Sequence, residues 1–177
     1  MPVAYLCLGS NLGNRKGNLC RAVTLLADRV TIEDVSSIYE TEPVPILYRG
    51  KEQPWFLNMA CRIVTSLPPE GLLHLAKGVE VRMGRVLGGE RNAPRPIDID
   101  ILLYDSKAMK TRSLTIPHPR MTERAFVLIP LAEIAPDAVH PVCGKSIAQL
   151  ARDVERQEGV QKHTGGVDVS AICGRAL

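Results

Sequence analysis

One alternating stretch near the middle of the chain constrains the fold more than any other feature. From Ile97 to Tyr104, aliphatic residues are interrupted by two aspartates, Asp98 and Asp100. Side chains of a β-strand point alternately to opposite faces, so the pattern predicts a strand with three isoleucines on one face and both carboxylates on the other. The two aspartates would then lie roughly 6.6 Å apart along the strand. The fold must bury one face of this strand and accommodate an acidic pair on the other.

The segments before this strand predict a β-α-β-β-α-β order. We expect strands at 3–8, 31–41, 56–65 and 97–104, and helices at 14–28 and 68–83. In the first helix, Asn14 is a plausible N-cap, and apolar residues between Leu19 and Leu26 recur at helical spacing. The order matches the split βαβ, or ferredoxin-like, plan. We therefore predict an α+β fold with a mainly antiparallel sheet and helices packed on its faces.

Glycine and proline mark the predicted loops. We expect loops at 42–54 and 84–96, an irregular segment at 111–124, and short helices at 128–134 and 147–156. Residues 44–54 and 84–96 are predicted to be mobile lids. Because no linker is visible, residues 1–158 are assigned to a single domain. Residues 159–177 are glycine-rich and weakly patterned, and are expected to form a C-terminal tail that is loose or packs late.

Composition excludes several classes of protein. A length of 177 residues with 45% apolar content suits one globular domain, and a net charge of +3 is too balanced for a protein that coats nucleic acid. The five cysteines are widely spaced without a CxxC pair, which argues against a disulfide framework or a zinc site and favours buried thiols in a reducing compartment. No signal peptide or membrane-spanning run of about 18 apolar residues is visible. We expect a cytoplasmic protein.

Arginines surround the acidic pair in the sequence. The basic residues nearest to it are Arg82, Arg85, Arg91, Arg95, Arg112, His118, Arg120 and Arg124. Arginine suits forked phosphate contacts, and Mg²⁺ favours carboxylate and phosphate oxygens. This inventory indicates metal-assisted phosphoryl transfer, although a solvated strand face with surface ion pairs would give the same pattern.

Aromatic and amide side chains suggest a second part of the site. Phe56 and Asn58 share a face of a predicted strand, so a flat heteroaromatic could stack on the ring while the amide contacts its edge. Phe56 and Phe126 could equally be core residues. His118, between two prolines, is either a phosphate donor or a turn residue. The Gly9–Gly13 segment lacks the GxxxxGK[ST] pattern and is interpreted as a strand-to-helix turn.

Six segments together resemble the hydroxymethyldihydropterin pyrophosphokinase family. They are 8–12, 39–43, 54–58, 91–100, 117–118 and 124–128, in the family's order and spacing, and they cover roughly residues 3 to 140. The segment 91–100 carries the family's R-x-x-D-[aliphatic]-D pattern. The resemblance implies transfer of diphosphate from ATP to 6-hydroxymethyl-7,8-dihydropterin in folate biosynthesis, with release of AMP. It also implies a monomer.

The resemblance implies roles for individual residues. Asp98 and Asp100 would bind two Mg²⁺ ions and, with Arg85 and Arg95, form the catalytic group. The implied pterin-binding residues are Thr41, Pro43, Val44, Phe56, Asn58 and Phe126. The implied ATP-binding residues are Lys77, Glu80, Arg85, Arg95, Ile101, Thr115, His118 and Arg124.

Three positions depart from the family's pattern. Leu87 stands where many relatives carry a second loop arginine, Asn92 replaces a frequent lid tryptophan, and Pro119 replaces a frequent tyrosine. Arg82 and Arg91 are candidates to replace the missing arginine.

Two rival functions follow from the residues alone. One is a nucleotidyltransferase that uses the acidic pair and releases pyrophosphate. The other is a non-catalytic binding module of ferredoxin-like shape. An aromatic content of 4% argues against RNA binding, and a sensing module would not need paired aspartates.

Overall fold

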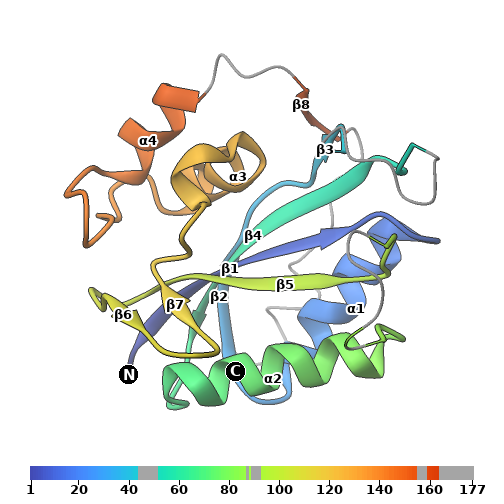
Figure 1. Cartoon of the computed structure of the whole chain (residues 1–177), viewed down its shortest axis with the longest axis horizontal. Coiled ribbons are helices and arrows are strands. Elements are labelled where there is room, and N and C mark those ends of the chain that lie inside the picture. Colours follow the sequence, from blue (N-terminus) through green and yellow to red (C-terminus); the bar gives the residue numbers. More distant parts are fainter. Residues whose placement is uncertain (44–51, 87, 89–92, 155–158, 164–177) are drawn as a thin grey trace.

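A six-stranded antiparallel sheet forms the centre of the computed structural model, which describes residues 1–43, 52–86, 88, 93–154 and 159–163 (Figure 1). The elements in chain order are β1 (Val3–Ser10), α1 (Arg15–Ala27), β2 (Thr31–Val35), β3 (Tyr39–Thr41), β4 (Phe56–Val64), α2 (Pro69–Arg82), β5 (Asp98–Tyr104), β6 (Met109–Lys110), β7 (Thr115–Ile116), the 3-10 helix η1 (Met121–Glu123), α3 (Ala125–Ile134), α4 (Ile147–Val154) and β8 (Val160–Lys162).

The strand order is β5-β1-β4-β3-β8, and β2 also pairs with β4. Every strand pair that the structure describes is antiparallel. The central strand β1 pairs with β4 on one side and β5 on the other, so Gly9 lies opposite both Asn58 and Asp98. This arrangement confirms the predicted α+β fold with a mainly antiparallel sheet.

The helices cover both faces of the sheet, with α1 and α2 on one side and α3 and α4 on the other (Figure 1). The alternation of strand side chains produces a hydrophobic core on each side. Leu8 and Ile99 belong to the core under α1 and α2, whereas Ala60 and Leu103 belong to the core under α3 and α4.

Local sequence explains the ends of the first two helices. The Asn14 side chain accepts a hydrogen bond from the Gly17 amide at 3.0 Å, which confirms the predicted N-cap of α1. Pro69 begins α2 in the first turn, where the missing amide hydrogen is not needed. The predicted alternation of β5 is also confirmed, because Ile97, Ile99 and Ile101 are buried in the first core.

The predicted strand at 31–41 is wrong, because two strands occupy it with a break at residues 36–38. The Ser36 amide donates to the Ala60 carbonyl at 2.9 Å, and the Ser36 hydroxyl accepts from the Ala60 amide at 2.8 Å. A side-chain oxygen thus takes the place of a backbone carbonyl and interrupts the ladder. The segment 111–124, predicted to be irregular, contains the short elements β7 and η1.

The expected C-terminal tail contributes a strand to the sheet. Within it, β8 pairs with β3, and the His163 amide donates to the Ile38 carbonyl at 2.8 Å. Part of the stretch expected to be a tail, Val160–Lys162, is therefore paired with the sheet. Residues 155–158 and 164–177, and much of both predicted lids, lie outside the described residues.

The cysteines follow the prediction only in part. Cys7 and Cys61 are buried, Cys20 is partly buried, and Cys143 is exposed, so the prediction of buried thiols is wrong for Cys143, which lies in a surface turn. Cys173 is outside the described residues. Among the helices that the structure describes, none has the length and apolar character needed to cross a bilayer.

Candidate active site

A cavity of about 300 Å³ opens where β1, β4 and β5 face the start of α3. Its lining residues are Cys7, Gly9, Thr41, Glu42, Phe56, Asn58, Arg95, Asp98, Asp100, His118, Arg124 and Phe126. Gly9 keeps the middle of the cavity open, because a Cβ atom there would lie 2.8 Å from the Asn58 Oδ1 atom. The cavity therefore joins an acidic end on β5 to an aromatic and amide end on β4 and α3.

The structure brings most of the predicted site residues together. Thr41, Phe56, Asn58, Arg95, Asp98, Asp100, His118, Arg124 and Phe126 all line the cavity. Pro43 is described but is not part of this lining, and Val44 lies outside the described residues. The Ile101 side chain is buried in the core under α1 and α2, and Thr115 lines a separate pocket of about 500 Å³ that shares His118.

Three lining residues, Cys7, Gly9 and Glu42, were not predicted. Cys7 and Gly9 are two apart on β1, and the sheet places them opposite Asp100 and Asp98. Their period-two spacing on a strand was visible in the sequence, but their place beside the aspartates depends on the pairing of β1 with β5. Glu42 directly follows β3 and was visible only as a loop residue.

A chain of ion pairs lies behind and beside Asp98. The buried Glu80 carboxylate binds Lys77 Nζ at 2.9 Å and Arg85 Nη1 at 2.7 Å. Arg85 Nη1 also contacts the Asp98 Oδ1 atom, and Arg95 Nη1 lies 3.1 Å from the Asp98 Oδ2 atom. The predicted ATP-side residues Lys77, Glu80 and Arg85 therefore form a support for Asp98 although they do not line the cavity.

Glu80 also links this network directly to β5. Its Oε1 atom accepts a hydrogen bond from the Ile99 amide at 2.7 Å, between the two aspartates. Burial raises the pKa of Glu80, and its contacts with Lys77, the Ile99 amide and Arg85 offset this only in part. The Glu80 side chain is nevertheless fully buried.

The two aspartates differ in their electrostatic environment. Burial would raise the pKa of Asp98, but Arg85 and Arg95 outweigh it and hold that pKa below its usual value. For Asp100, burial and the neighbouring charge of Asp98 raise the pKa, and His118 compensates only weakly. The charged form of Asp98 is therefore stabilised by its neighbours, whereas the charged form of Asp100 is disfavoured and would be stabilised by a bound cation.

The donor set fits a divalent cation that arrives with a polyphosphate. The Asp100 carboxylate accepts a hydrogen bond from no residue that the structure describes, and its ion-pair contact with His118 Nε2 is 3.9 Å long. Within the same residues, no three His, Cys, Asp or Glu side chains are grouped so that they could hold a metal ion. Mg²⁺ completes its shell with water and phosphate oxygens rather than with protein ligands alone, so the Asp98 and Asp100 pair suits it.

His118 is held by its own backbone turn. Its amide donates to the Leu102 carbonyl at 2.9 Å, and its Nδ1 atom accepts from the Arg120 amide at 3.2 Å. Burial lowers the pKa of His118, although Asp100 opposes this. With Nδ1 acting as the acceptor, the proton of the neutral ring lies on Nε2, the atom nearest Asp100. His118 therefore presents a hydrogen-bond donor to the cavity.

The aromatic end of the cavity is built from β3, β4 and α3. Asn58 Nδ2 donates to the Thr41 hydroxyl at 2.8 Å, which fixes the orientation of a buried amide. Phe56 and Phe126 line the cavity from β4 and the first turn of α3, and both rings are partly exposed. The Arg124 guanidinium carbon lies 5.5 Å from the Phe126 ring centre. Both rings thus present surface to the cavity and are not simply core residues.

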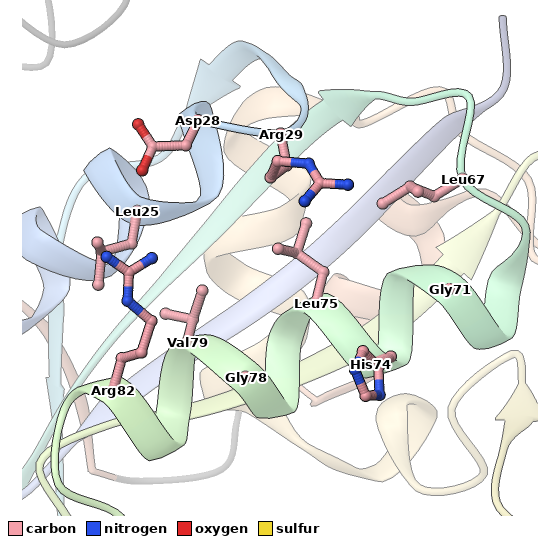
Figure 2. Close-up of a pocket in the computed structure, with 10 residues that line it drawn as sticks. All are labelled: Leu25, Asp28, Arg29, Leu67, Gly71, His74, Leu75, Gly78, Val79 and Arg82. Carbon is pink, nitrogen blue, oxygen red and sulfur yellow. The ribbon is translucent and has the colours of Figure 1, made fainter.

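Of the two arginines proposed to replace the missing loop arginine, Arg82 is not among the residues that line the cavity. Arg82 lies in a groove between α1 and α2, on the other side of the sheet (Figure 2). Arg91, Leu87 and Asn92 are outside the described residues. Pro119 is exposed next to His118 and lines the separate pocket that contains Thr115.

Comparison with known proteins gives one consistent family. The family model described as 7,8-dihydro-6-hydroxymethylpterin-pyrophosphokinase (HPPK) matches residues 5–136. The chain is 44% identical over 171 residues to the 2-amino-4-hydroxy-6-hydroxymethyldihydropteridine pyrophosphokinase of Bacillus subtilis, covering 94% of each chain. It is 45% identical over 141 residues to the enzyme of that name from Methylorubrum extorquens, covering 78% of this chain and 86% of the relative.

Some similar proteins are much longer than this chain. The folate synthesis bifunctional protein of Arabidopsis thaliana is 45% identical over 130 residues, covering 73% of this chain but 26% of the relative. The wild-type HPPK-DHPS of Plasmodium falciparum, solved with pteroate, superposes with a TM-score of 0.69 at 16% identity over 91% of this chain. The match covers 47% of that solved chain, so this chain spans about half of its length. The superposition supports the fold alone.

Proposed function

The chain belongs to the 7,8-dihydro-6-hydroxymethylpterin-pyrophosphokinase family, and we propose that it transfers diphosphate from ATP to the hydroxymethyl group of 6-hydroxymethyl-7,8-dihydropterin, releasing AMP. It is an ATP-dependent diphosphotransferase, because its relatives are named as the pyrophosphokinase of this pterin. The observation that carries the proposal is the cavity itself, which places two carboxylates and two arginines next to a buried amide and two partly exposed phenylalanine rings.

The aromatic end of the cavity is the proposed pterin site. Phe56 and Phe126 would hold the flat ring by stacking, and Asn58, oriented by Thr41, would hydrogen-bond its polar edge. Pro43 and Val44 are proposed to contribute backbone contacts. This pose would point the hydroxymethyl group along β1 past Gly9 toward the aspartates, because Gly9 lies opposite both Asn58 and Asp98.

The acidic end is the proposed phosphate site. Arg95, His118 and Arg124 line it and present hydrogen-bond donors, and Arg85 stands behind Asp98. We propose that Asp98 and Asp100 hold two Mg²⁺ ions, which when bound neutralise phosphate charge and polarise the reacting oxygens. Lys77, Glu80, Ile101 and Thr115 are proposed to form the remaining ATP side. Of these, Lys77 and Glu80 act through the ion pairs that position Arg85.

The proposed reaction is one displacement at phosphorus. The hydroxymethyl oxygen of the pterin forms a bond to the β-phosphorus of ATP, and the bond between that phosphorus and the oxygen bridging to the α-phosphorus breaks. AMP leaves with the electron pair, and the proton of the alcohol passes to solvent. The protein's share is to hold both substrates in line and to stabilise the transferred charge with Arg85 and Arg95, without a dedicated base.

Identification of the nucleotide product tests this proposal. The protein is incubated with ATP, Mg²⁺ and 6-hydroxymethyl-7,8-dihydropterin, and the nucleotides are separated by anion exchange, with EDTA and pterin-free samples beside it. Pterin-dependent AMP and a pterin diphosphate are expected. Formation of ADP would identify a monophosphate transfer, and formation of pyrophosphate would identify the rival nucleotidyltransferase. A monomeric state, a cytoplasmic location and a single domain over residues 1–158 stay predictions.

Gly9→Ala is predicted to weaken pterin binding more than it weakens the fold. The new Cβ atom would lie 2.8 Å from Asn58 Oδ1, so the amide must move away from the position that its bond to Thr41 fixes. We expect KM for the pterin to rise about tenfold, as for the loss of one well-placed hydrogen bond, with kcat changed by less than about threefold. Steady-state kinetics measure both, and an unchanged pterin KM would contradict this placement of Asn58.

Phe126→Ala is predicted to lower pterin affinity without abolishing ATP binding. Stacking of a heteroaromatic base on an aromatic side chain contributes about 1–3 kcal/mol, so we expect the Kd of the pterin to rise about 10- to 100-fold. Titration calorimetry with the pterin and with a non-hydrolysable ATP analogue separates the two sites. A leucine at the same position is the matched control, because it keeps apolar volume but not the ring. Equal affinities in the leucine variant and the native protein would rule out stacking.

A further inference from the structure

The helices α1 and α2 leave a groove of about 560 Å³ on the side of the sheet opposite the candidate active site. Residues of α1, of α2 and of the segments next to these helices line it, and its apolar members include Leu25, Leu75 and Val79. Figure 2 shows the side chains of Leu25, Leu75 and Val79 pointing into the space between the two helices. The groove has an apolar floor and the size of a small-molecule site.

Glycine keeps this groove open. A Cβ atom added at Gly78 would meet no atom within 4 Å, so any side chain at this position would extend into the groove. Glycine in the interior of a helix is less stable than alanine, because it has more conformational freedom to lose on folding. The glycine that leaves space beside Val79 therefore makes α2 less stable than an alanine would.

The charged groups around the groove include more basic than acidic side chains. Arg29 and Arg82 both line it, and within the described part of the chain neither forms an ion pair. Figure 2 shows the Arg82 guanidinium beside Leu25 and the Arg29 guanidinium above Leu75, while Asp28 extends in the opposite direction from Arg29. Asp28 is the one acidic residue of the lining. Two guanidinium groups without carboxylate partners beside an apolar floor favour an anion with an apolar body.

We propose that the groove between α1 and α2 is a second binding site, for a small amphipathic anion. The apolar part of the ligand lies on Leu25, Leu75 and Val79, and its carboxylate, sulfonate or phosphate group binds Arg29 and Arg82. The groove lies outside the cavity that holds the proposed pterin and ATP sites, so the two substrates do not compete for it.

A matched pair of fluorescent probes tests the proposal on the full chain. 8-Anilinonaphthalene-1-sulfonate is an anion with an apolar body, and N-phenyl-1-naphthylamine is the same ring system without the sulfonate. We expect the sulfonate to bind at least about tenfold more tightly, because a charged group gains strong hydrogen bonds from guanidinium. Equal affinities for the two probes, or no binding of the sulfonate at millimolar concentration, would overturn the proposal.

Substitutions at Gly78 locate the probe. Gly78→Leu places a side chain in the groove and is expected to lower sulfonate affinity about tenfold or more, whereas Gly78→Ala should change it by less than about threefold. Both variants remove the helix glycine, so their Tm should not fall below that of the native protein. Arg29→Gln is expected to weaken the sulfonate about five- to tenfold and leave the neutral probe unchanged.

Two outcomes would place the probe elsewhere and overturn the proposal. One is full sulfonate affinity in Gly78→Leu, and the other is displacement of the sulfonate by ATP with the pterin. Because the readout is probe binding and not turnover, failure here would leave the proposed reaction untouched. A failure to form AMP would likewise leave this site untouched.

Discussion

Asp100→Asn should lower kcat/KM about 1,000-fold while leaving the thermal stability of the protein unchanged or raised. The activity falls because the amide cannot replace an anionic Mg²⁺ ligand, and a bound metal supplies several kcal/mol of transition-state stabilisation, each 1.36 kcal/mol being about tenfold in rate. Stability does not fall because burial and the charge of Asp98 already disfavour the Asp100 carboxylate, as its raised pKa indicates. Pterin-dependent AMP formation and Tm without ligands measure the two effects.

The stability difference should depend on pH with a defined sign. The folded-state pKa of Asp100 lies above its unfolded value, so the folded protein holds this proton more tightly. Below the unfolded pKa of about 4 the carboxyl is neutral in both states, and the native protein and Asp100→Asn should have the same Tm. As pH rises through the folded pKa, the native protein loses the stability that the bound proton contributes. The variant should then become the more stable of the two.

Asp98→Asn is the matched control, because the same chemical change is made two residues away. Asp98 is paired with Arg85 and Arg95, and these arginines hold its pKa below the usual value despite burial. Its charge stabilises the fold above the unfolded pKa, and that contribution is lost as pH falls through the folded pKa. We expect Asp98→Asn to lose activity and Tm together. Equal losses of Tm in the two variants would contradict the electrostatic difference, and near-native activity of Asp100→Asn would contradict its role as a metal ligand.

The site residues that could be predicted from the residues alone are those whose placement follows from the alternation of side chains along one strand. The pattern from Ile97 to Tyr104 places Asp98 and Asp100 on one face, and the period of two places Phe56 and Asn58 together, as the structure confirms. These predictions needed only the geometry of one strand. The resemblance to a known family added the link between the two strands, which no local pattern contains.

Residues whose role depends on contacts distant in sequence could not be placed in this way. Gly9 is a turn residue in the sequence, and its role as the open centre of the cavity depends on the partners that β4 and β5 supply. Ser36 reads as an ordinary strand residue, and only its bonds to Ala60 reveal the break between β2 and β3. Arg82 was a candidate to replace the missing loop arginine, but its position on α2 places it on the opposite side of the sheet.

The burial of Glu80 could not be predicted from the sequence, and it leads to the second large prediction. The resemblance names Glu80 only as an ATP-binding residue, yet its side chain is fully buried next to β5. It holds three partners at once: Lys77 Nζ at 2.9 Å, Arg85 Nη1 at 2.7 Å and the Ile99 amide at 2.7 Å. A buried acid is tolerated at this point of α2 because each of its contacts is a donor or a cation.

Glu80→Ala should lower the free energy of unfolding by about 3 kcal/mol. Breaking a buried ion pair by removing one partner costs about 3–5 kcal/mol, and we expect the lower end because the Lys77 and Arg85 side chains are 34% and 22% exposed and can turn toward water. The Ile99 amide is buried and cannot turn toward water, so it would lose its hydrogen-bond acceptor. Glu80→Gln should cost only about 1–2 kcal/mol, because the amide oxygen can still accept from Ile99. Urea unfolding with an unchanged m-value measures both variants.

Glu123→Ala gives the control for Glu80→Ala, because Glu123 forms an ion pair with Arg120 at 3.7 Å in which both side chains are more than 60% exposed. Such a pair contributes little, so its loss should change the free energy of unfolding by less than about 0.5 kcal/mol. The same loss in both variants would show that burial of Glu80 does not set its contribution to the free energy of unfolding.

Glu80→Gln should also slow the reaction, because Arg85 loses the carboxylate that directs it toward Asp98. A stability loss in Glu80→Gln with full activity would show instead that Asp98 alone positions Arg85, and that Glu80 serves only the fold.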